Sequence, residues 1–197
     1  MTERIFAQGW AAGEGPGFVY CEAGSGETIV AILGAGRLPT RAHALLAERR
    51  RVIVFAMPAE AGSAQQAARR IGAAAAALGI ERFDLMGEGA GAEAALWLAL
   101  AAEAEIGSVV LAAPDGAPDE AFREIKRPVL VLCETKDRSA AGDRWRKLLT
   151  DCHFMFVYDV GHAIGEERPE ALAFITLEFF ERRDLFLVSR ESGLVFS

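Results

Sequence analysis

The chain has 197 residues, of which 52% are hydrophobic, so it can bury one sizeable core but is short for two domains. Lysine and arginine number 21 against 28 aspartate and glutamate residues, and the formal net charge is −7. This charge opposes binding to phosphate backbones and to anionic lipid surfaces, so neither nucleic acid nor a membrane is an expected partner. We expect a single domain spanning residues 1–197.

The three cysteines, Cys21, Cys133 and Cys152, are widely spaced and form no recognisable metal-binding pattern. We therefore expect no metal site and a reducing, cytoplasmic location. Residues 1–13 contain no apolar run typical of a secretory signal, and no apolar stretch approaches the ~20 residues that cross a bilayer. Nothing in the composition calls for a cofactor, and the expected partner is a small-molecule ligand or substrate.

In chain order, short apolar or β-branched runs alternate with longer helical patterns, which is typical of a parallel sheet covered on both faces. The expected strands are Phe18–Glu22, Thr28–Leu33, Arg51–Ala56, Phe83–Met86, Ser108–Ala113, Pro128–Glu134 and Phe154–Asp159. The expected helices are Arg41–Arg50, Ser63–Leu78, Ala90–Glu103, Ala140–Leu149 and Pro169–Arg182. The predicted fold class is α/β, a three-layer α/β/α sandwich with a mostly parallel sheet.

The C-terminal segment, residues 184–197, has a different pattern. Two short apolar pieces, Leu185–Val188 and Leu194–Phe196, flank a polar turn. They suit a terminal hairpin, or a strand added to a neighbouring subunit in a homo-oligomer.

The segment Gly87-Glu88-Gly89-Ala90-Gly91 follows an expected strand and precedes an expected helix. It resembles the nucleophile elbow of the α/β-hydrolase superfamily, whose members usually have the motif G-x-S-x-G. Gly87 and Gly91 match the two flanking glycines, while Gly89 occupies the position of the catalytic serine. The resemblance runs from about Phe18 to Arg182 and implies an α/β-hydrolase fold.

Two later positions match the same family in its chain order. Asp137 follows the strand Pro128–Glu134 and matches the catalytic acid, and His162 matches the catalytic histidine. Upstream, the loop after Thr28–Leu33 resembles the one that supplies an oxyanion-hole amide, here from Ala35 or Gly36. By the same resemblance, Ala90 would supply the second amide.

The chain departs from the family pattern in two further respects. Leu33 stands where the family usually has a histidine, which puts the shape of the loop after it in doubt. Only Asp115–Arg127 separates two strands between which many relatives insert a lid, so we expect no cap domain and an open site.

Glycine at the elbow changes the chemistry. Gly89 relieves roughly 1–3 kcal/mol of backbone strain and removes the only atom that could form an acyl-enzyme there. No replacement nucleophile is evident: Ser108 lies at the wrong end of its strand, and Cys133 lies inside one. Glu88 is either an acid, base or nucleophile working with His162, or a partly exposed carboxylate near a helix N-terminus. The sequence favours the second interpretation, because adjacent residues in a tight turn point their side chains in different directions.

Three functional hypotheses follow. The first is a hydrolase-fold protein without the serine mechanism, acting as a non-catalytic or ligand-binding member. The second is an enzyme in which Asp137 orients His162 as a general base toward water or a substrate, with ester or amide hydrolysis or proton abstraction as its reaction. The third is a dinucleotide-binding protein, since Gly87-x-Gly89-x-x-Ala92 fits a loose fingerprint, although the next strand ends without the required acidic residue. His43 and His153 are assigned structural roles.

Overall fold

The structure is a computed structural model that describes residues 5–13, 15–58, 62–115, 118–135, 141–149, 152–161, 163–183 and 186. Eight strands form one sheet in the order β1-β2-β4-β3-β5-β6-β7-β8. The pairings β1–β2 and β2–β4 are antiparallel, and all others are parallel. The strands are β1 (Ala7–Gly13), β2 (Gly15–Ala23), β3 (Thr28–Leu33), β4 (Arg51–Ala56), β5 (Phe83–Glu88), β6 (Ile106–Ala112), β7 (Val129–Glu134) and β8 (Cys152–Val157).

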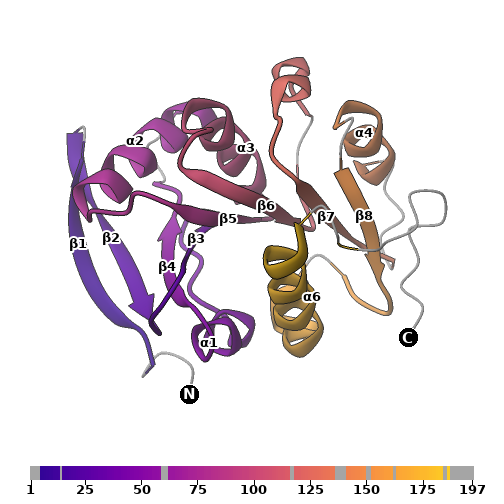
Figure 1. Cartoon of the computed structure of the whole chain (residues 1–197), viewed down its shortest axis with the longest axis horizontal. Coiled ribbons are helices and arrows are strands. Elements are labelled where there is room, and N and C mark those ends of the chain that lie inside the picture. Colours follow the sequence, from indigo (N-terminus) through magenta and orange to yellow (C-terminus); the bar gives the residue numbers. More distant parts are fainter. Residues whose placement is uncertain are drawn as a thin grey trace.

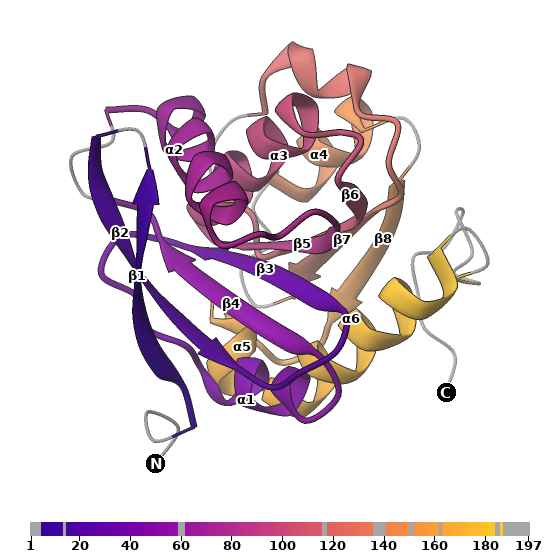
Figure 2. The same ribbon diagram turned by 60° about the vertical axis from the view of Figure 1, so that its left-hand side comes forward.

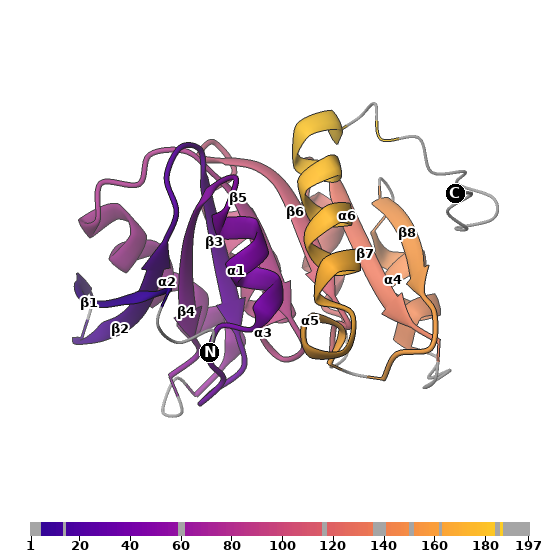
Figure 3. The ribbon, with the colours of Figure 1, turned by 90° about the horizontal axis from the view of Figure 1, so that it is seen from below.

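Helices cover the two faces of the sheet, which Figure 1 shows from the side and Figure 3 from below. Helices α2 (Ala64–Ala77), α3 (Gly91–Ala101) and α4 (Ala141–Leu148) lie on one face. The opposite face carries α1 (Arg41–Ala47), α5 (Ile164–Glu167) and α6 (Pro169–Arg182). This arrangement confirms the predicted three-layer α/β/α sandwich.

Side chains of β3 alternate between the two cores. Val30 and Ile32 pack toward α2 and α3, whereas Ile29, Ala31 and Leu33 pack toward α1 and α6. Since both faces are covered, the strand is apolar from Ile29 to Leu33, as parallel strands usually are. The continuous apolar runs of the sequence were therefore a reliable signal for the central strands.

Strand β1 is the element that the sequence pattern did not predict. It pairs with β2 and forms a hairpin at one edge of the sheet, in the foreground of Figure 2. Its sequence, Ala-Gln-Gly-Trp-Ala-Ala-Gly, contains no β-branched residue, so local propensity gives little sign of a strand. Packing against β2 stabilises it instead: the Tyr20 ring lies so close to Gly9 that a side chain added there would collide with it.

The remaining differences from the prediction are shifted ends of elements and two additional short elements. β5 continues to Glu88 and β6 begins at Ile106, and two short elements, η2 (Glu120–Glu124, a 3₁₀-helix) and α5, were not predicted. Apart from Phe186, the predicted C-terminal hairpin lies outside the described residues. Between β6 and β7, the described residues contain η2 and no larger insertion. No helix in the described part of the chain is long and apolar enough to cross a membrane.

Candidate functional site

The turn between β5 and α3 has the conformation of an elbow. β5 ends at Glu88, α3 begins at Gly91, and Gly89 between them has a φ angle of 53° in the left-handed region. The Gly89 N–H donates to the Ala112 carbonyl (3.0 Å), and the Asp115 N–H donates to the Gly89 carbonyl (3.2 Å). These bonds hold the turn against the end of β6, so residue 89 faces outward at the carboxyl edge of the sheet.

The two glycines that flank the elbow are required by close packing. A Cβ atom at Gly87 would lie 2.6 Å from the Ala92 Cα, and one at Gly91 would collide with the Ile32 carbonyl. Both contacts are to backbone, which cannot move aside as a side chain would. The reason for small residues at these positions is thus the crowding of strand and helix that the motif implies.

A cleft of about 420 Å³ opens at the elbow, at the carboxyl ends of the central parallel strands. This is the edge at which α/β sheets usually bind ligands. The cleft is lined by the elbow, the loop after β3, the start of the β6–η2 segment and α5: Leu33, Gly34, Ala35, Arg37, Leu38, Thr40, Glu88, Gly89, Ala90, Asp115, Ala163, Gly165 and Glu166.

Four predicted site residues, Ala35, Glu88, Gly89 and Ala90, line this one cleft. Gly36 instead lines a shallower neighbouring hollow. Asp137 and His162 lie outside the described residues, so the predicted acid–histidine pair remains a prediction from the sequence.

Glu88 is the main titratable group in the cleft. Its side chain is only 18% exposed, and its Oε1 atom lies 3.2 Å from His43 Nε2. Neither atom has a hydrogen-bond partner among the described residues, because the 3.2 Å approach lacks hydrogen-bond geometry. Burial raises the pKa of Glu88 from 4.5 to about 7, with Arg37 lowering it and Glu166 raising it. The tight-turn argument favoured a more exposed carboxylate, but the fold encloses the side chain between α1 and α5.

The sequence indicated only a structural role for His43, but in the structure its ring contacts both the helix cap and Glu88. It is fully buried in the first turn of α1, where its Nδ1 atom accepts the backbone N–H of Thr40 at 3.1 Å. This is the reciprocal half of a capping box, with imidazole in the place of the usual Glu or Gln. Since Nδ1 accepts, the neutral ring carries its proton on Nε2, the atom that faces Glu88. Burial lowers the pKa of His43 from 6.5 to about 4.

The pairing of His43 with Glu88 could not be read from either sequence segment. Thr40 followed by a polar residue at the third helical position indicates a helix start, but not the strand that it faces. Only the order of strands in the sheet brings the beginning of α1 beside the end of β5.

Asp115 is a cleft residue that the sequence analysis did not select. Its Oδ2 atom lies 3.2 Å from the point where a Cβ atom of residue 89 would stand. A carboxylate therefore faces the space that a nucleophile side chain would enter. The sequence signal was its place three residues after the last residue of the apolar strand β6, which the structure shows to pair with the elbow strand β5.

The rim of the cleft is held by ion pairs. Arg37 Nη2 contacts Glu166 Oε1 at 2.6 Å, joining the loop after β3 to α5. Nearby, the Gly161 N–H donates to Glu167 Oε1 (3.0 Å), and Asp159 accepts from Arg168 at 3.4 Å. Among the described residues, no three His, Cys, Asp or Glu side chains are arranged to hold a metal ion.

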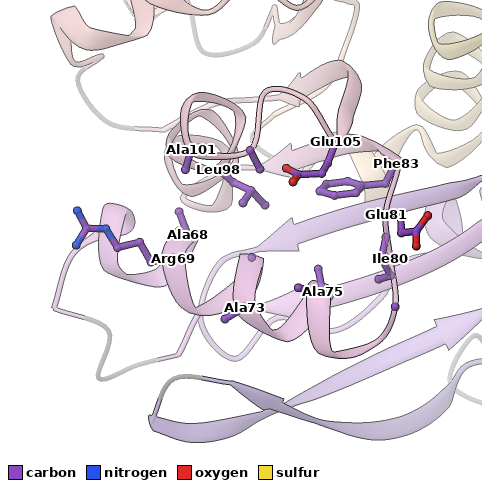
Figure 4. A pocket seen from close by; sticks show the side chains of 14 residues that line it. Ala68, Arg69, Ala73, Ala75, Ile80, Glu81, Phe83, Leu98, Ala101 and Glu105 are labelled. Atoms are coloured by element: carbon purple, nitrogen blue, oxygen red, sulfur yellow. The ribbon is translucent and has the colours of Figure 1, made fainter.

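A larger but shallower groove of about 800 Å³ lies at the opposite end of the strands (Figure 4). It runs between α2 and α3 and is lined largely by alanine, with Arg69, Glu81 and Glu105 as its charged residues. Its described lining holds no histidine, cysteine, serine or buried titratable side chain. We therefore take the elbow cleft as the candidate functional site.

The strand order, the left-handed elbow and the cleft above it together define the α/β-hydrolase fold. The family model described as "Alpha/beta hydrolase family" matches residues 9–173. The chain belongs to this family.

Solved structures agree with this assignment at the level of the fold. A predicted CIB-like hydrolase from Thermoplasma acidophilum superimposes with a TM-score of 0.74 at 16% identity, covering 88% of this chain and 97% of that one. A serine hydrolase involved in carbazole degradation gives 0.78 at 17% identity, with 90% and 100% covered. A Bacillus subtilis carboxylesterase gives 0.74 at 13% identity, with 88% and 91% covered. No curated protein matches the chain in sequence.

Proposed function

We propose that this protein binds a small uncharged or cationic molecule in the elbow cleft and forms no acyl-enzyme there. The observation that carries the proposal is the elbow itself: residue 89 keeps the left-handed conformation but has no side chain, and Asp115 faces the vacated position. The proposal concerns only the mechanism and ligand of this member, since its membership of the hydrolase family is established above.

The position of Asp115 argues against the usual serine-hydrolase chemistry. That chemistry places an oxyanion beside the elbow, where backbone N–H groups stabilise it. Here the residues that would supply those amides, Ala35 and Ala90, share the cleft with the Asp115 carboxylate. A fixed negative charge close to a developing oxyanion would raise the barrier instead of lowering it.

The charge of the lining supports the ligand class. Glu88, Asp115 and Glu166 line the cleft against one cation, Arg37, which is already paired with Glu166. Among the described lining residues, the balance is therefore negative when Glu88 is ionised and still negative when it is protonated. Carboxylate ligands should be repelled, whereas neutral molecules and amines should be tolerated or favoured.

The first test is covalent labelling with a fluorophosphonate probe, which reacts with activated serine nucleophiles. The unaltered protein should remain unlabelled. In a Gly89→Ser variant, the new Cβ atom would lie only 3.2 Å from Asp115 Oδ2, so the Asp115 side chain would have to move. Labelling of Gly89→Ser should therefore be compared with labelling of Gly89→Ser combined with Asp115→Ala. Labelling of the unaltered protein would refute the proposal.

The second test is binding of hexylamine, hexanol and hexanoate, three probes of similar length and different charge, measured by calorimetry. We expect hexylamine and hexanol to bind more tightly than hexanoate. Asp115→Asn, which removes one negative charge at nearly constant volume, should narrow the difference between amine and carboxylate. Preferential binding of hexanoate by the unaltered protein would contradict the proposed ligand class.

A further inference from the structure

The proposed function leaves one cleft residue without a role. Glu88 is largely buried, lines the cleft and has an Oε1 atom with no hydrogen-bond partner among the described residues. A buried carboxylate oxygen left in this state is costly unless a ligand, a water molecule or a proton satisfies it. The residue therefore calls for an explanation beyond ligand charge.

We propose that Glu88, positioned by His43, is a general base that takes a proton from a small uncharged molecule bound in the elbow cleft. This inference rests on the proposed function, because it requires a ligand in that cleft. It extends that function from binding to an elimination or isomerisation reaction that needs no nucleophile at residue 89.

The two carboxylate oxygens of Glu88 have different surroundings. Its Oε1 atom faces the imidazole of His43, while its Oε2 atom lies on the side of Gly165, where an added Cβ would come within 3.1 Å of it. Gly165 lines the cleft and is itself buried, and a side chain there would crowd Oε2 as well as Thr40. Oε1 is thus the buried oxygen that faces His43, and Oε2 lies beside a residue of the cleft lining.

His43 acts as a positioning residue in this arrangement. Its Nδ1 atom is occupied by the Thr40 N–H, so the neutral ring can present only an N–H toward Glu88. At 3.2 Å, such a group attracts the carboxylate electrostatically and restricts its position without taking its proton. Because the ring is fully buried, it has little freedom to turn away.

The charged surroundings suit a base that works near neutral pH. The charged and titratable groups that face Glu88 or share its cleft are His43 from α1, Arg37 from the loop after β3, Asp115 after β6 and Glu166 from α5. Burial raises the pKa of Glu88 to about 7, with a smaller increase from Glu166 and an opposing decrease from Arg37. A catalytic base is most effective when its pKa lies close to the working pH.

In the proposed step, a Glu88 oxygen forms a bond to hydrogen as the C–H bond of the bound molecule breaks. The electron pair of that bond forms a new π bond while a leaving group departs with its own electron pair. Glu88 becomes a neutral acid and later releases its proton to water that enters the cleft once the product has left. No oxidant, reductant or covalent intermediate is needed.

A suitable probe is 5-nitrobenzisoxazole, in which removal of one C–H proton breaks the ring N–O bond and releases a coloured cyanophenolate. Its isostere 5-nitroindazole cannot undergo this elimination and reports binding alone. We expect the unaltered protein to catalyse the elimination with a rate that rises through about pH 7, in line with the raised pKa of Glu88.

Variants then assign the base. Since general-base catalysis typically contributes 10²–10⁴-fold, Glu88→Gln should lower kcat by at least about tenfold on this unselected probe while still binding 5-nitroindazole. His43→Gln should keep activity but move the midpoint of the pH profile. Glu170→Gln, an exposed carboxylate on α6 that is paired with Arg41 outside the cleft, should leave the rate unchanged.

Each other outcome has a definite meaning. Binding of 5-nitroindazole without elimination would overturn the inference and leave the proposed function standing, whereas binding of neither probe by the unaltered protein would count against both. Loss of elimination in Asp115→Asn or His162→Ala, with Glu88→Gln unaffected, would assign the base elsewhere. If Glu88→Gln lost binding and rate together, Glu88 would be a binding residue and the inference would fail.

Discussion

His43 Nε2 lies 3.2 Å from Glu88 Oε1, so the first turn of α1 meets the last residue of β5 through two buried titratable side chains. Both are shifted toward their neutral forms by burial, Glu88 upward and His43 downward in pKa. The contact is therefore between an uncharged ring and a carboxyl group that changes charge near neutral pH. It is not a permanent ion pair, and its energetic consequences depend on pH.

The first prediction concerns the pH dependence of stability at Glu88. Its folded pKa of about 7 exceeds the usual 4.5, so its favourable contribution is complete below pH 4.5 and is lost as the pH rises through 7. Glu88→Gln cannot ionise, so its free energy of unfolding relative to the unaltered protein should increase by roughly 3 kcal/mol between pH 4.5 and 8. Urea unfolding across this range measures the difference.

Glu170→Gln is the matched control for that measurement, because the Glu170 side chain is 64% exposed and is paired with the exposed side chain of Arg41. Its stability difference should stay flat with pH. An equally flat difference for Glu88→Gln would show that Glu88 titrates normally.

The second prediction concerns His43 as part of the helix cap. His43→Leu would leave the partly buried Thr40 N–H without its acceptor, and a loss of this kind typically lowers the free energy of unfolding by about 1–3 kcal/mol. His43→Gln should be less destabilising at pH 7, since glutamine at this position can accept the same N–H in a capping box. Thermal unfolding of the two variants compares them directly, and equal losses would indicate that packing alone decides the effect.

Much of the fold could be predicted because the central strands and helices carry strong local signals. β3 and β4 were predicted to the residue, since a charged residue precedes each apolar run and a glycine- or proline-containing segment follows it. β1 was missed because its glycine- and alanine-rich sequence becomes a strand only by pairing with β2. Elements of this kind depend on contacts that are distant in sequence.

The candidate site was predictable to a smaller extent. Gly89, Ala90 and Ala35 were found from a motif in which backbone conformation and chemistry are linked. The Glu88–His43 contact and the position of Asp115 depend on which strand ends are neighbours in the sheet. The resemblance pointed to residues that line one cleft, but it did not indicate which acidic groups would surround them.

The third prediction addresses the packing of the elbow. Gly87→Ala would force a Cβ atom against the Ala92 backbone at 2.6 Å, so strand and helix must separate. We expect a loss of roughly 3 kcal/mol or more, at the upper end of overpacking effects. In Gly36→Ala, the new Cβ atom meets no atom within 4 Å, and the only strain comes from the positive φ of 71°. This change should lower the free energy of unfolding by about 1 kcal/mol. Denaturant unfolding tests the ranking, which would be wrong if Gly36→Ala were the more damaging change.

The fourth prediction concerns a buried carboxylate at the opposite end of the sheet. Asp84 is 4% exposed and accepts a hydrogen bond from the Ser108 hydroxyl at 2.8 Å, while Arg50 and Arg183 lie farther away at 3.6 and 3.8 Å. Burial raises the pKa of Asp84 and the Ser108 bond lowers it. Ser108→Ala should therefore destabilise the fold by about 1–3 kcal/mol at pH 7. A double-mutant cycle with Asp84→Asn should show coupling, and additive losses would argue against the bond.

The fifth prediction has the opposite sign, because Thr176 differs from Ser108 in one respect. Both side chains are fully buried, but the Thr176 Oγ1 atom has no hydrogen-bond partner among the described residues, whereas Ser108 has Asp84. An unsatisfied buried hydroxyl has lost its hydration without replacement, at a typical cost of about 1–3 kcal/mol. Thr176→Val keeps the branched shape and removes that hydroxyl, so it should stabilise α6 against the sheet and raise the melting temperature. A lower melting temperature would mean that the hydroxyl is satisfied in solution, and high-resolution crystallography of the unaltered protein would then be expected to show a buried water molecule beside it.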